Sequence, residues 1–183
     1  MSVEMFDKNP PKYLENIRLA ARTLSMLYSD LSANLKAVPL SLGEFDVSAI
    51  LKERVRFFEL LAAKKNLEFR LDMPQNLVLK TDEYRISKII DNLLSNAVKY
   101  SNKGEKIYIN LYENGINVAQ KGVVIPPEKM SKIYDKFTRF DSTNGGFGVG
   151  LSLVKTYCCE LGYSINCSSS EEQTKFSVSF KKA

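Results

Sequence analysis

Apolar residues near the N-terminus recur at alternating steps of three and four positions. The series consists of Leu14, Ile17, Ala21, Leu24, Tyr28, Leu31 and Leu35. This is the a/d spacing of a helix that packs against other helices in a coiled-coil bundle. An ordinary amphipathic helix lying on its own domain is the alternative, because about three heptads is the shortest run at which the spacing is informative. In both cases the apolar stripe needs a partner surface.

The chain changes character after residue 35. Residues 36–43 contain Pro39 and Gly43 and are typical of a linker that leads into a short edge strand. We therefore expect two parts: an N-terminal helix with its linker in residues 1–43, and a separate domain in residues 44–183.

The hydrophobic pattern of this second part predicts helices and strands in mixed order. Helices are expected at 47–65, with Ser48 near the cap, over a long segment capped by Thr81 or Asp82, at 127–136, and from the glycines of 145–150 to Leu161. Strands are expected at 67–71, 77–79, 106–112, 115–119, 163–168 and 176–180. Because no βαβ units alternate, we predict an α+β two-layer sandwich, with helices on one face of a mixed, mainly antiparallel sheet.

Composition and charge exclude several classes of protein. The 26 Lys and Arg residues against 21 Asp and Glu give a net charge of +5, spread without a basic stripe, so we expect no nucleic-acid partner. No apolar run approaches the roughly 18 residues that span a bilayer, so we expect no membrane contact by this segment. The cysteines, Cys158, Cys159 and Cys167, indicate packing thiols in a reducing compartment. Histidine is absent, which excludes histidine-based catalysis within the chain.

A glycine-rich segment precedes the last predicted helix. Gly146, Gly148 and Gly150 alternate with other residues directly before it. Such a loop lets backbone N–H groups approach an anion, and the helix adds its positive N-terminal end. Taken alone, the segment fits a flexible surface turn as well as it fits a phosphate site.

Polar residues line one flank of the long predicted helix. Asn92, Asn96 and Lys99 share that flank, beside an Ile/Leu core stripe, and Tyr100 follows. Amide oxygens suit Mg²⁺, which keeps phosphate and water oxygens as its other ligands, and a lysine one turn further on can meet phosphate charge. The alternative is a solvated polar flank, although Asn is a poor helix former.

Two further segments are ambiguous on their own. The strand that ends at Gln120 is followed by Gly122 and by Ile125-Pro126, which also fits an ordinary strand and turn. Residues 133–140 carry aromatic side chains that are most simply placed in the core.

In their order along the chain, these segments resemble the catalytic ATP-binding domain of bacterial sensor histidine kinases. That domain belongs with the gyrase, heat-shock chaperone and mismatch-repair ATPases. The resemblance covers about residues 44–183 and lies in DNLLSNAVKYS at 91–101, IYDKFTRFD at 133–141 and GGFGVGLSLVK at 145–155. Residues 9–36 are similar to the second helix of the dimerisation and phosphotransfer hairpin.

The resemblance implies a Bergerat-type ATP-binding fold with ATP and Mg²⁺ as cofactors. It places Asn96 on Mg²⁺, Asn92, Lys99 and Arg139 near the phosphates, and Tyr100 against the base or ribose. It makes Gly146, Gly148 and Gly150 the hinge and phosphate cradle of a mobile lid at 138–147, and Ile125 part of the adenine pocket. Four more positions complete the implied ATP site: Gln120, Gly122, Val149 and Leu151.

The chain departs from the family pattern Asp-x-Gly-x-Gly, where it has Gln120 and, at the last glycine, Val124. In the family the aspartate accepts a hydrogen bond from the adenine amino group. An uncharged Gln120 acceptor loses about 1 kcal/mol, or roughly five- to tenfold in affinity. Val124 is expected to narrow the pocket. The alternative function is therefore a degenerate domain that binds partner proteins and no longer uses ATP.

The resemblance also implies that the γ-phosphate of ATP passes to a histidine on the hairpin's first helix and then to a response regulator. Since the chain has no histidine, we expect a fragment of a longer kinase that cannot label itself on histidine. The family implies a homodimer through the hairpin helices, and a cytoplasmic position in a kinase anchored in the inner membrane. Residues 36–43 would be the hinge of the ATP-binding domain.

Overall fold

The computed structural model describes residues 14, 17, 24, 39–138 and 148–180. The chain divides into two units, residues 1–38 and 39–183. In the first unit Leu14, Ile17 and Leu24 are helical, and each side chain is more than half exposed. The helix prediction therefore holds at these three positions, and the rest of the apolar stripe lies outside the described residues.

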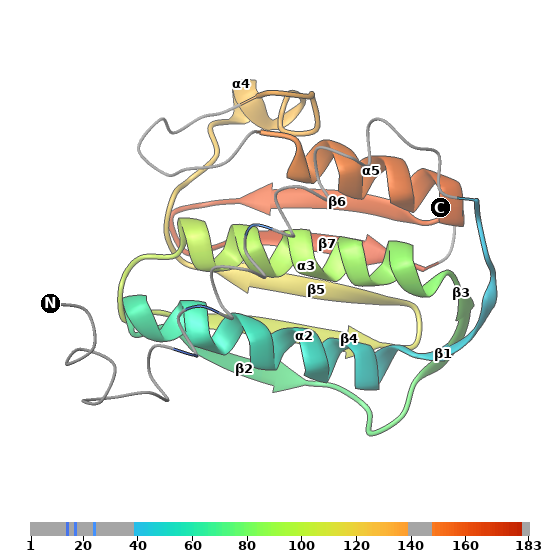
Figure 1. The fold of residues 1–183 in the computed structure, drawn as a ribbon. Coiled ribbons are helices and arrows are strands. Elements are labelled where there is room, and N and C mark those ends of the chain that lie inside the picture. Colours follow the sequence, from blue (N-terminus) through green and yellow to red (C-terminus); the bar gives the residue numbers. More distant parts are fainter. Residues whose placement is uncertain (1–13, 15–16, 18–23, 25–38, 139–147, 181–183) are drawn as a thin grey trace, which may run out of the picture. The chain divides into compact units, whose positions relative to one another are not determined.

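A five-stranded sheet forms one layer of the second unit (Figure 1). Its order is β2 (Glu68–Asp72), β4 (Lys106–Tyr112), β5 (Gly115–Gln120), β7 (Thr174–Ser179) and β6 (Ser164–Ser169). Only the β2–β4 pair is parallel among these strands. A separate antiparallel pair joins β1 (Gly43–Asp46) to β3 (Val78–Thr81). The predicted mixed, mainly antiparallel sheet is confirmed.

Three helices form the other layer and lie side by side across one face of the sheet, in the order α2, α3, α5 (Figure 1). They are α2 (Val47–Ala62), followed by the short 3₁₀ turn η1 (Ala63–Lys65), then α3 (Glu83–Tyr100) and α5 (Gly150–Leu161). The core between the layers is apolar. Its fully buried members include Leu51, Phe58, Ile86, Ile90, Leu93, Ile107, Ile109, Ile116 and Val118.

Carboxylates set the starts of the two long helices. Asp46 caps α2, and Ser48 lies near the cap as predicted: Asp46 Oδ1 accepts the backbone N–H groups of Ser48 at 2.9 Å and Ala49 at 3.2 Å. Asp82 caps α3 by accepting the N–H of Arg85 at 2.9 Å, which decides between the two predicted caps. At the other end of α5, Gly162 adopts φ +70° and stops the helix as predicted.

The helix predicted at 127–136 is shorter than expected. Helix α4 covers only Pro127–Met130. Residues after it make single turns, in which the N–H of Lys132 bonds to Lys129 and that of Asp135 to Lys132. Ile133 is buried there, but one apolar residue offers no helical face to bury, so the turns do not extend into a longer helix.

The last residues of the predicted linker are bound to the start of α3. The N–H of Ser41 donates to Asp82 Oδ2 at 2.8 Å, and the guanidinium of Arg85 donates to the carbonyl of Pro39 at 3.4 Å. Arg85 also pairs with Asp82 at 3.0 Å and with Glu160 near the end of α5. This charge network, buried at Asp82 and Arg85 and exposed at Glu160, joins the linker, α3 and α5. Within the described ranges, no helix has the length and apolar composition needed to cross a bilayer.

Candidate functional site

The polar flank of α3 begins with a buried amide. Asn92 is 7% exposed, and its Nδ2 donates to the carbonyl of Lys88 one turn earlier at 2.8 Å. That bond orients the side chain and leaves its Oδ1 directed at the first residue of α5, Gly150. Asn96 and Lys99 follow on the same flank and are half-buried. The flank is therefore partly enclosed and not fully solvated.

Asn92 and Gly150 meet although they are far apart in the sequence. A Cβ atom on Gly150 would lie 2.5 Å from Asn92 Oδ1, closer than a Cβ atom approaches other heavy atoms. Glycine at this position lets the start of α5 reach the asparagine helix. The structure thus brings the asparagine segment and the glycine segment together, as the sequence interpretation requires.

The turn after β5 closes onto the other end of α3. A Cβ atom on Gly122 would overlap the carbonyl oxygen of Tyr100. Gly122 forms a β-bridge with Ser101, and the N–H of Val123 donates to the Tyr100 carbonyl at 3.1 Å. The third predicted segment therefore lies against the C-terminal end of the asparagine helix.

Gln120 ends β5, and its side chain is buried. It follows Ile116 and Val118 in the row that faces the helices, and it is 3% exposed. Its Oε1 has no hydrogen-bond partner among the described residues. A buried carbonyl oxygen without a hydrogen bond lowers the stability of the fold by about 1–3 kcal/mol. A bound ligand that donates a hydrogen bond to this oxygen would offset the loss.

The aromatic segment meets the glycine segment through its backbone. The N–H of Phe137 donates to the carbonyl of Gly148 at 2.9 Å, and the two residues have φ +63° and +69°. This left-handed turn directs the Phe137 side chain outward, where it is 70% exposed, so the predicted core position is wrong for this residue. Ile133 does lie in the core. The predicted residues Arg139 and Gly146, with lid residues 139–147, lie outside the described residues.

The remaining predicted residues are placed around this region. Val149 is buried, and its carbonyl accepts the N–H of Leu153 at 3.0 Å, while Leu151 is half-buried. The N–H of Ile125 donates to Ser169 Oγ at 2.9 Å, which fixes the chain after Gly122 against β6. The Lys99 ammonium lies 4.7 Å from the centre of the Tyr100 ring, a cation–π contact.

One residue that positions the site escaped the sequence interpretation. Lys65, in η1, donates to the carbonyl oxygens of Val98 at 3.1 Å, Lys99 at 2.7 Å and Ser101 at 3.3 Å. These carbonyls end α3 and lack helical partners. In the sequence, Lys64 and Lys65 look like two solvent-exposed lysines. Only the contact of Lys65 with the end of α3, which the sequence does not show, gives Lys65 a structural role.

Asp91, next to Asn92, is a buried carboxylate whose negative charge is only partly balanced by nearby positive charges. It is 6% exposed, and its Oδ1 lies 3.7 Å from Arg54 Nε, too far for a hydrogen bond. Burial raises the pKa of Asp91, and the positive charges of Arg54 and Lys88 oppose that rise only in part. The helix that carries the candidate site therefore holds a destabilising charge on its other flank.

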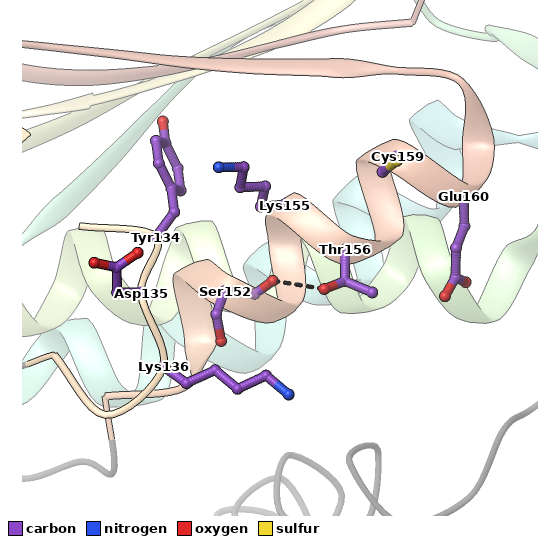
Figure 2. A pocket seen from close by; sticks show the side chains of 8 residues that line it. All are labelled: Tyr134, Asp135, Lys136, Ser152, Lys155, Thr156, Cys159 and Glu160. Atoms are coloured by element: carbon purple, nitrogen blue, oxygen red, sulfur yellow. Dashed lines mark hydrogen bonds between the residues drawn. The ribbon is translucent and has the colours of Figure 1, made fainter. Parts of the chain in front are cut away.

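A hollow of about 540 Å³ opens on the exposed side of α5 (Figure 2). Tyr134, Asp135 and Lys136 line it from the segment before α5, and Ser152, Lys155, Thr156, Cys159 and Glu160 line it along the helix. Thr156 Oγ1 donates to the carbonyl of Ser152 at 3.0 Å. These lining residues include none of the predicted site residues, so the hollow is distinct from the region around Asn92 and Gln120.

The side chains available as metal ligands indicate how the expected Mg²⁺ could be bound. Among the residues that the structure describes, no group of three or more His, Cys, Asp or Glu side chains could hold a metal ion. The flank of α3 offers neutral amide oxygens instead, on half-buried Asn96 and buried Asn92. Such donors fit Mg²⁺ that arrives with phosphate oxygens, and they do not fit a resident metal held by protein alone.

A comparison with protein families matches residues 81–183 to the model described as histidine kinase-, DNA gyrase B- and HSP90-like ATPase. Among curated proteins, the sensor protein VanSC of Enterococcus gallinarum is 28% identical over 182 residues, which cover 93% of this chain and 50% of VanSC. The chain thus spans about half the length of the relatives first matched.

Solved structures of a histidine kinase superpose on this chain. The catalytic domain of histidine kinase ThkA superposes with a TM-score of 0.70 and 26% identity, covering 78% of this chain and 97% of that domain. ThkA in complex with the response regulator protein TrrA superposes with a TM-score of 0.67 and 25% identity, covering 96% of this chain and 52% of that one.

Proposed function

Because the chain belongs to the family of histidine kinase-, DNA gyrase B- and HSP90-like ATPases, we propose that residues 44–183 bind Mg²⁺-ATP as the catalytic domain of a sensor histidine kinase. The family and its relatives support the histidine kinase ATPase assignment. The activity of the whole protein, its acceptor and its partners are part of the proposal.

The approach of Asn92 to Gly150 carries the proposal. Three segments that are separate in the sequence meet along α3, since Gly150 contacts Asn92 and Gly122 contacts Tyr100. A buried acceptor on Gln120 lies two residues before Gly122. An ordinary polar helix flank needs no such convergence of two glycines and an unpaired amide.

Different residues would contact different parts of the nucleotide. Gln120 would accept a hydrogen bond from the base, with Ile125 and Tyr100 beside the base or ribose. Lys99 and Asn92 would face the phosphates, together with Arg139, and the backbone of Gly146, Gly148 and Gly150 would cradle them next to Val149 and Leu151. Asn96 would hold the Mg²⁺, whose chemistry is to neutralise phosphate charge.

In phosphoryl transfer, the role of this chain would be to position the nucleotide, and its residues would form no covalent bond with it. The residues above hold the triphosphate in one orientation and keep its terminal phosphoryl group available to an acceptor. The chain contains no histidine, so the acceptor is a histidine supplied by another polypeptide segment. A response regulator then receives the phosphoryl group, and the full protein is a homodimer anchored in the inner membrane.

The predicted hinge at residues 36–43 is part of this proposal. Two of its residues, Pro39 and Ser41, are hydrogen-bonded to the start of α3. Rigidifying residues 36–43 should slow autophosphorylation of the full-length kinase. An unchanged rate would contradict the hinge.

Titration with a non-hydrolysable ATP analogue tests the binding step. We expect saturable binding with Mg²⁺, at least tenfold weaker binding for Asn96→Ala, and unchanged binding for Asn102→Ala, an exposed asparagine just after α3. The transfer step is tested by incubating the chain with ATP and a separate polypeptide that carries the acceptor histidine. No saturable binding up to about millimolar analogue would overturn the proposal.

The degenerate, partner-binding domain remains the competing function because of Gln120 and Val124. Val124 is 41% exposed, so its side chain does not fill the interior beside Gln120. The titration separates the two functions, since a degenerate domain would keep its fold and fail to bind the analogue.

A further inference from the structure

Gln120 differs in hydrogen-bonding character from a carboxylate at the same position. A carboxylate only accepts hydrogen bonds, whereas a primary amide has an accepting oxygen and two N–H donors on nitrogen. The two ends have nearly the same shape, and a rotation of the terminal amide exchanges them. The chemistry of this one side chain therefore decides which atoms of a base can face it.

The structure leaves the amide oxygen of Gln120 without a hydrogen-bond partner among the described residues. The inward-facing residues paired with it across the sheet are Ile107 on β4 and Thr174 on β7. Ile107 has no polar side-chain atom, and Thr174 Oγ1 is already engaged with Val123 O at 3.1 Å and Ser169 Oγ at 2.6 Å. Among the described residues nothing pairs with Oε1, so neither amide orientation is fixed through that oxygen.

A purine presents opposite polarity at its 6-position depending on the base. Adenine carries an amino donor there beside the N1 acceptor, and hypoxanthine and guanine carry a carbonyl acceptor beside an N1–H donor. An amide satisfies the first pair with its oxygen toward the 6-position and the second pair after rotation. A carboxylate, for a base in the same pose, would place acceptor against acceptor at a 6-oxo group.

We propose that Gln120 makes this site permissive, so that it binds 6-oxo purine nucleoside triphosphates as well as 6-amino ones. The inference rests on the proposed nucleotide-binding function and adds the substrate range of the same site. A family member with aspartate at this position is expected to discriminate against the 6-oxo base, because a buried acceptor facing another acceptor costs about ten- to a hundredfold in affinity.

The test compares ATP with ITP, which has the 6-oxo group without the extra 2-amino group of GTP. Binding of each Mg²⁺-nucleotide is measured by calorimetric titration to the whole chain and to Gln120→Asp. We expect the unmodified chain to bind ITP within about tenfold of ATP. The Gln120→Asp variant should bind ATP at least as tightly as before and ITP ten- to a hundredfold more weakly.

A matched control makes the same chemical change on the opposite face of β5. Asn117→Asp also converts an amide to a carboxylate, but Asn117 faces away from the helices and is half-exposed. This variant should keep the ITP-to-ATP ratio of the unmodified chain. Thermal unfolding of both variants shows whether the fold is retained, and Gln120→Leu, which removes both hydrogen-bonding ends, serves as a second variant that should weaken both nucleotides equally.

The outcomes separate the two proposals. If neither nucleotide binds, the nucleotide-binding function itself fails. If ATP binds and ITP is rejected equally by the unmodified chain and by Gln120→Asp, the function stands and the permissive role of Gln120 is wrong. Unequal weakening of the two nucleotides by Gln120→Leu, with ITP unaffected, would also contradict it.

Discussion

The ammonium group of Lys65 lies 2.7 Å from the carbonyl oxygen of Lys99 and reaches the carbonyls of Val98 and Ser101 as well. The side chain of Lys65, which lies outside α3, thus caps the C-terminal end of the helix that carries the candidate site. Its positive charge also opposes the negative end of the helix dipole.

Replacing Lys65 by Met should destabilise the protein. The substitution removes three hydrogen bonds from a charged donor and leaves helix-terminal carbonyls unpaired, so we expect the free energy of unfolding to fall by about 1–2 kcal/mol. Urea unfolding followed by circular dichroism measures the change. The control is Lys64→Met, because Lys64 is exposed and adjacent. Equal effects of the two substitutions would show that the Lys65 contacts contribute nothing.

Replacing Gly150 by Ala should impair both nucleotide binding and stability. The new methyl group would lie 2.5 Å from Asn92 Oδ1, so Asn92 must move and give up its bond to Lys88. We expect at least tenfold weaker binding of an ATP analogue by titration, with a stability loss of about 1–3 kcal/mol.

The control for that substitution is Gly162→Ala at the other end of α5. Gly162 has φ +70°, and a Cβ there would meet no heavy atom within 4 Å among the residues described. Strain of about 1–2 kcal/mol should lower the stability while the nucleotide affinity stays the same. A loss of affinity equal to that of Gly150→Ala would attribute the effect to general destabilisation.

The Asp82 carboxylate should stabilise the fold in a pH-dependent way. Burial tends to raise the pKa of Asp82, but hydrogen bonds from the N–H groups of Ser41 and Arg85 and the Arg85 guanidinium together hold that pKa below its ordinary value. A lowered carboxyl pKa contributes stability that is fully present above about pH 4 and is lost as the pH falls through the folded pKa.

Asp82→Asn should therefore cost about 3 kcal/mol at pH 7, since it removes one partner of a buried pair. The difference from the unmodified chain should shrink below pH 4. Urea unfolding at a series of pH values measures it, with Glu83→Gln, an exposed neighbour, as the control. A difference that does not change with pH would exclude the charge of Asp82 as its cause.

Asp91 should have the opposite effect. Its pKa is raised, chiefly by burial, with Glu53 adding to the rise and Arg54 and Lys88 opposing it. The folded chain then binds the proton more tightly than the unfolded one, so stability falls as the pH rises from about 4 through the folded pKa. Asp91→Asn should abolish this slope and raise the stability at pH 7 by about 1.4 kcal/mol for each unit of the pKa difference. Exposed Asp72 supplies the control Asp72→Asn, and a less stable Asp91→Asn would show that the ion pair with Arg54 is net favourable.

Local periodicity was sufficient to predict most of the second unit. The apolar stripe from Ile86 to Ala97 predicted α3, and Gly162 predicted the end of α5, because each depends on neighbours within a few positions. The predicted sheet class followed from the same patterns, while its strand order β2-β4-β5-β7-β6 depends on long-range pairing that local patterns do not specify.

The errors have a common cause. Asp46 was not identified as the cap of α2, because strand β1 runs directly into α2 and the last strand residue is the cap. Phe137 was expected in the core, yet a left-handed turn bonded to Gly148 places its ring outside. Lys65 could not be distinguished from Lys64 without α3 beside it. Each outcome depends on a residue distant in the chain or on a junction between two elements.

The bonds of Pro39 and Ser41 fix the beginning of the second unit to one helix. Ser41 bonds to Asp82 and Pro39 to Arg85, at the start of α3, and the same helix carries Asn92. Arg85 also pairs with Glu160 on α5. One charge network therefore joins the beginning of this unit to both helices that meet at Asn92 and Gly150.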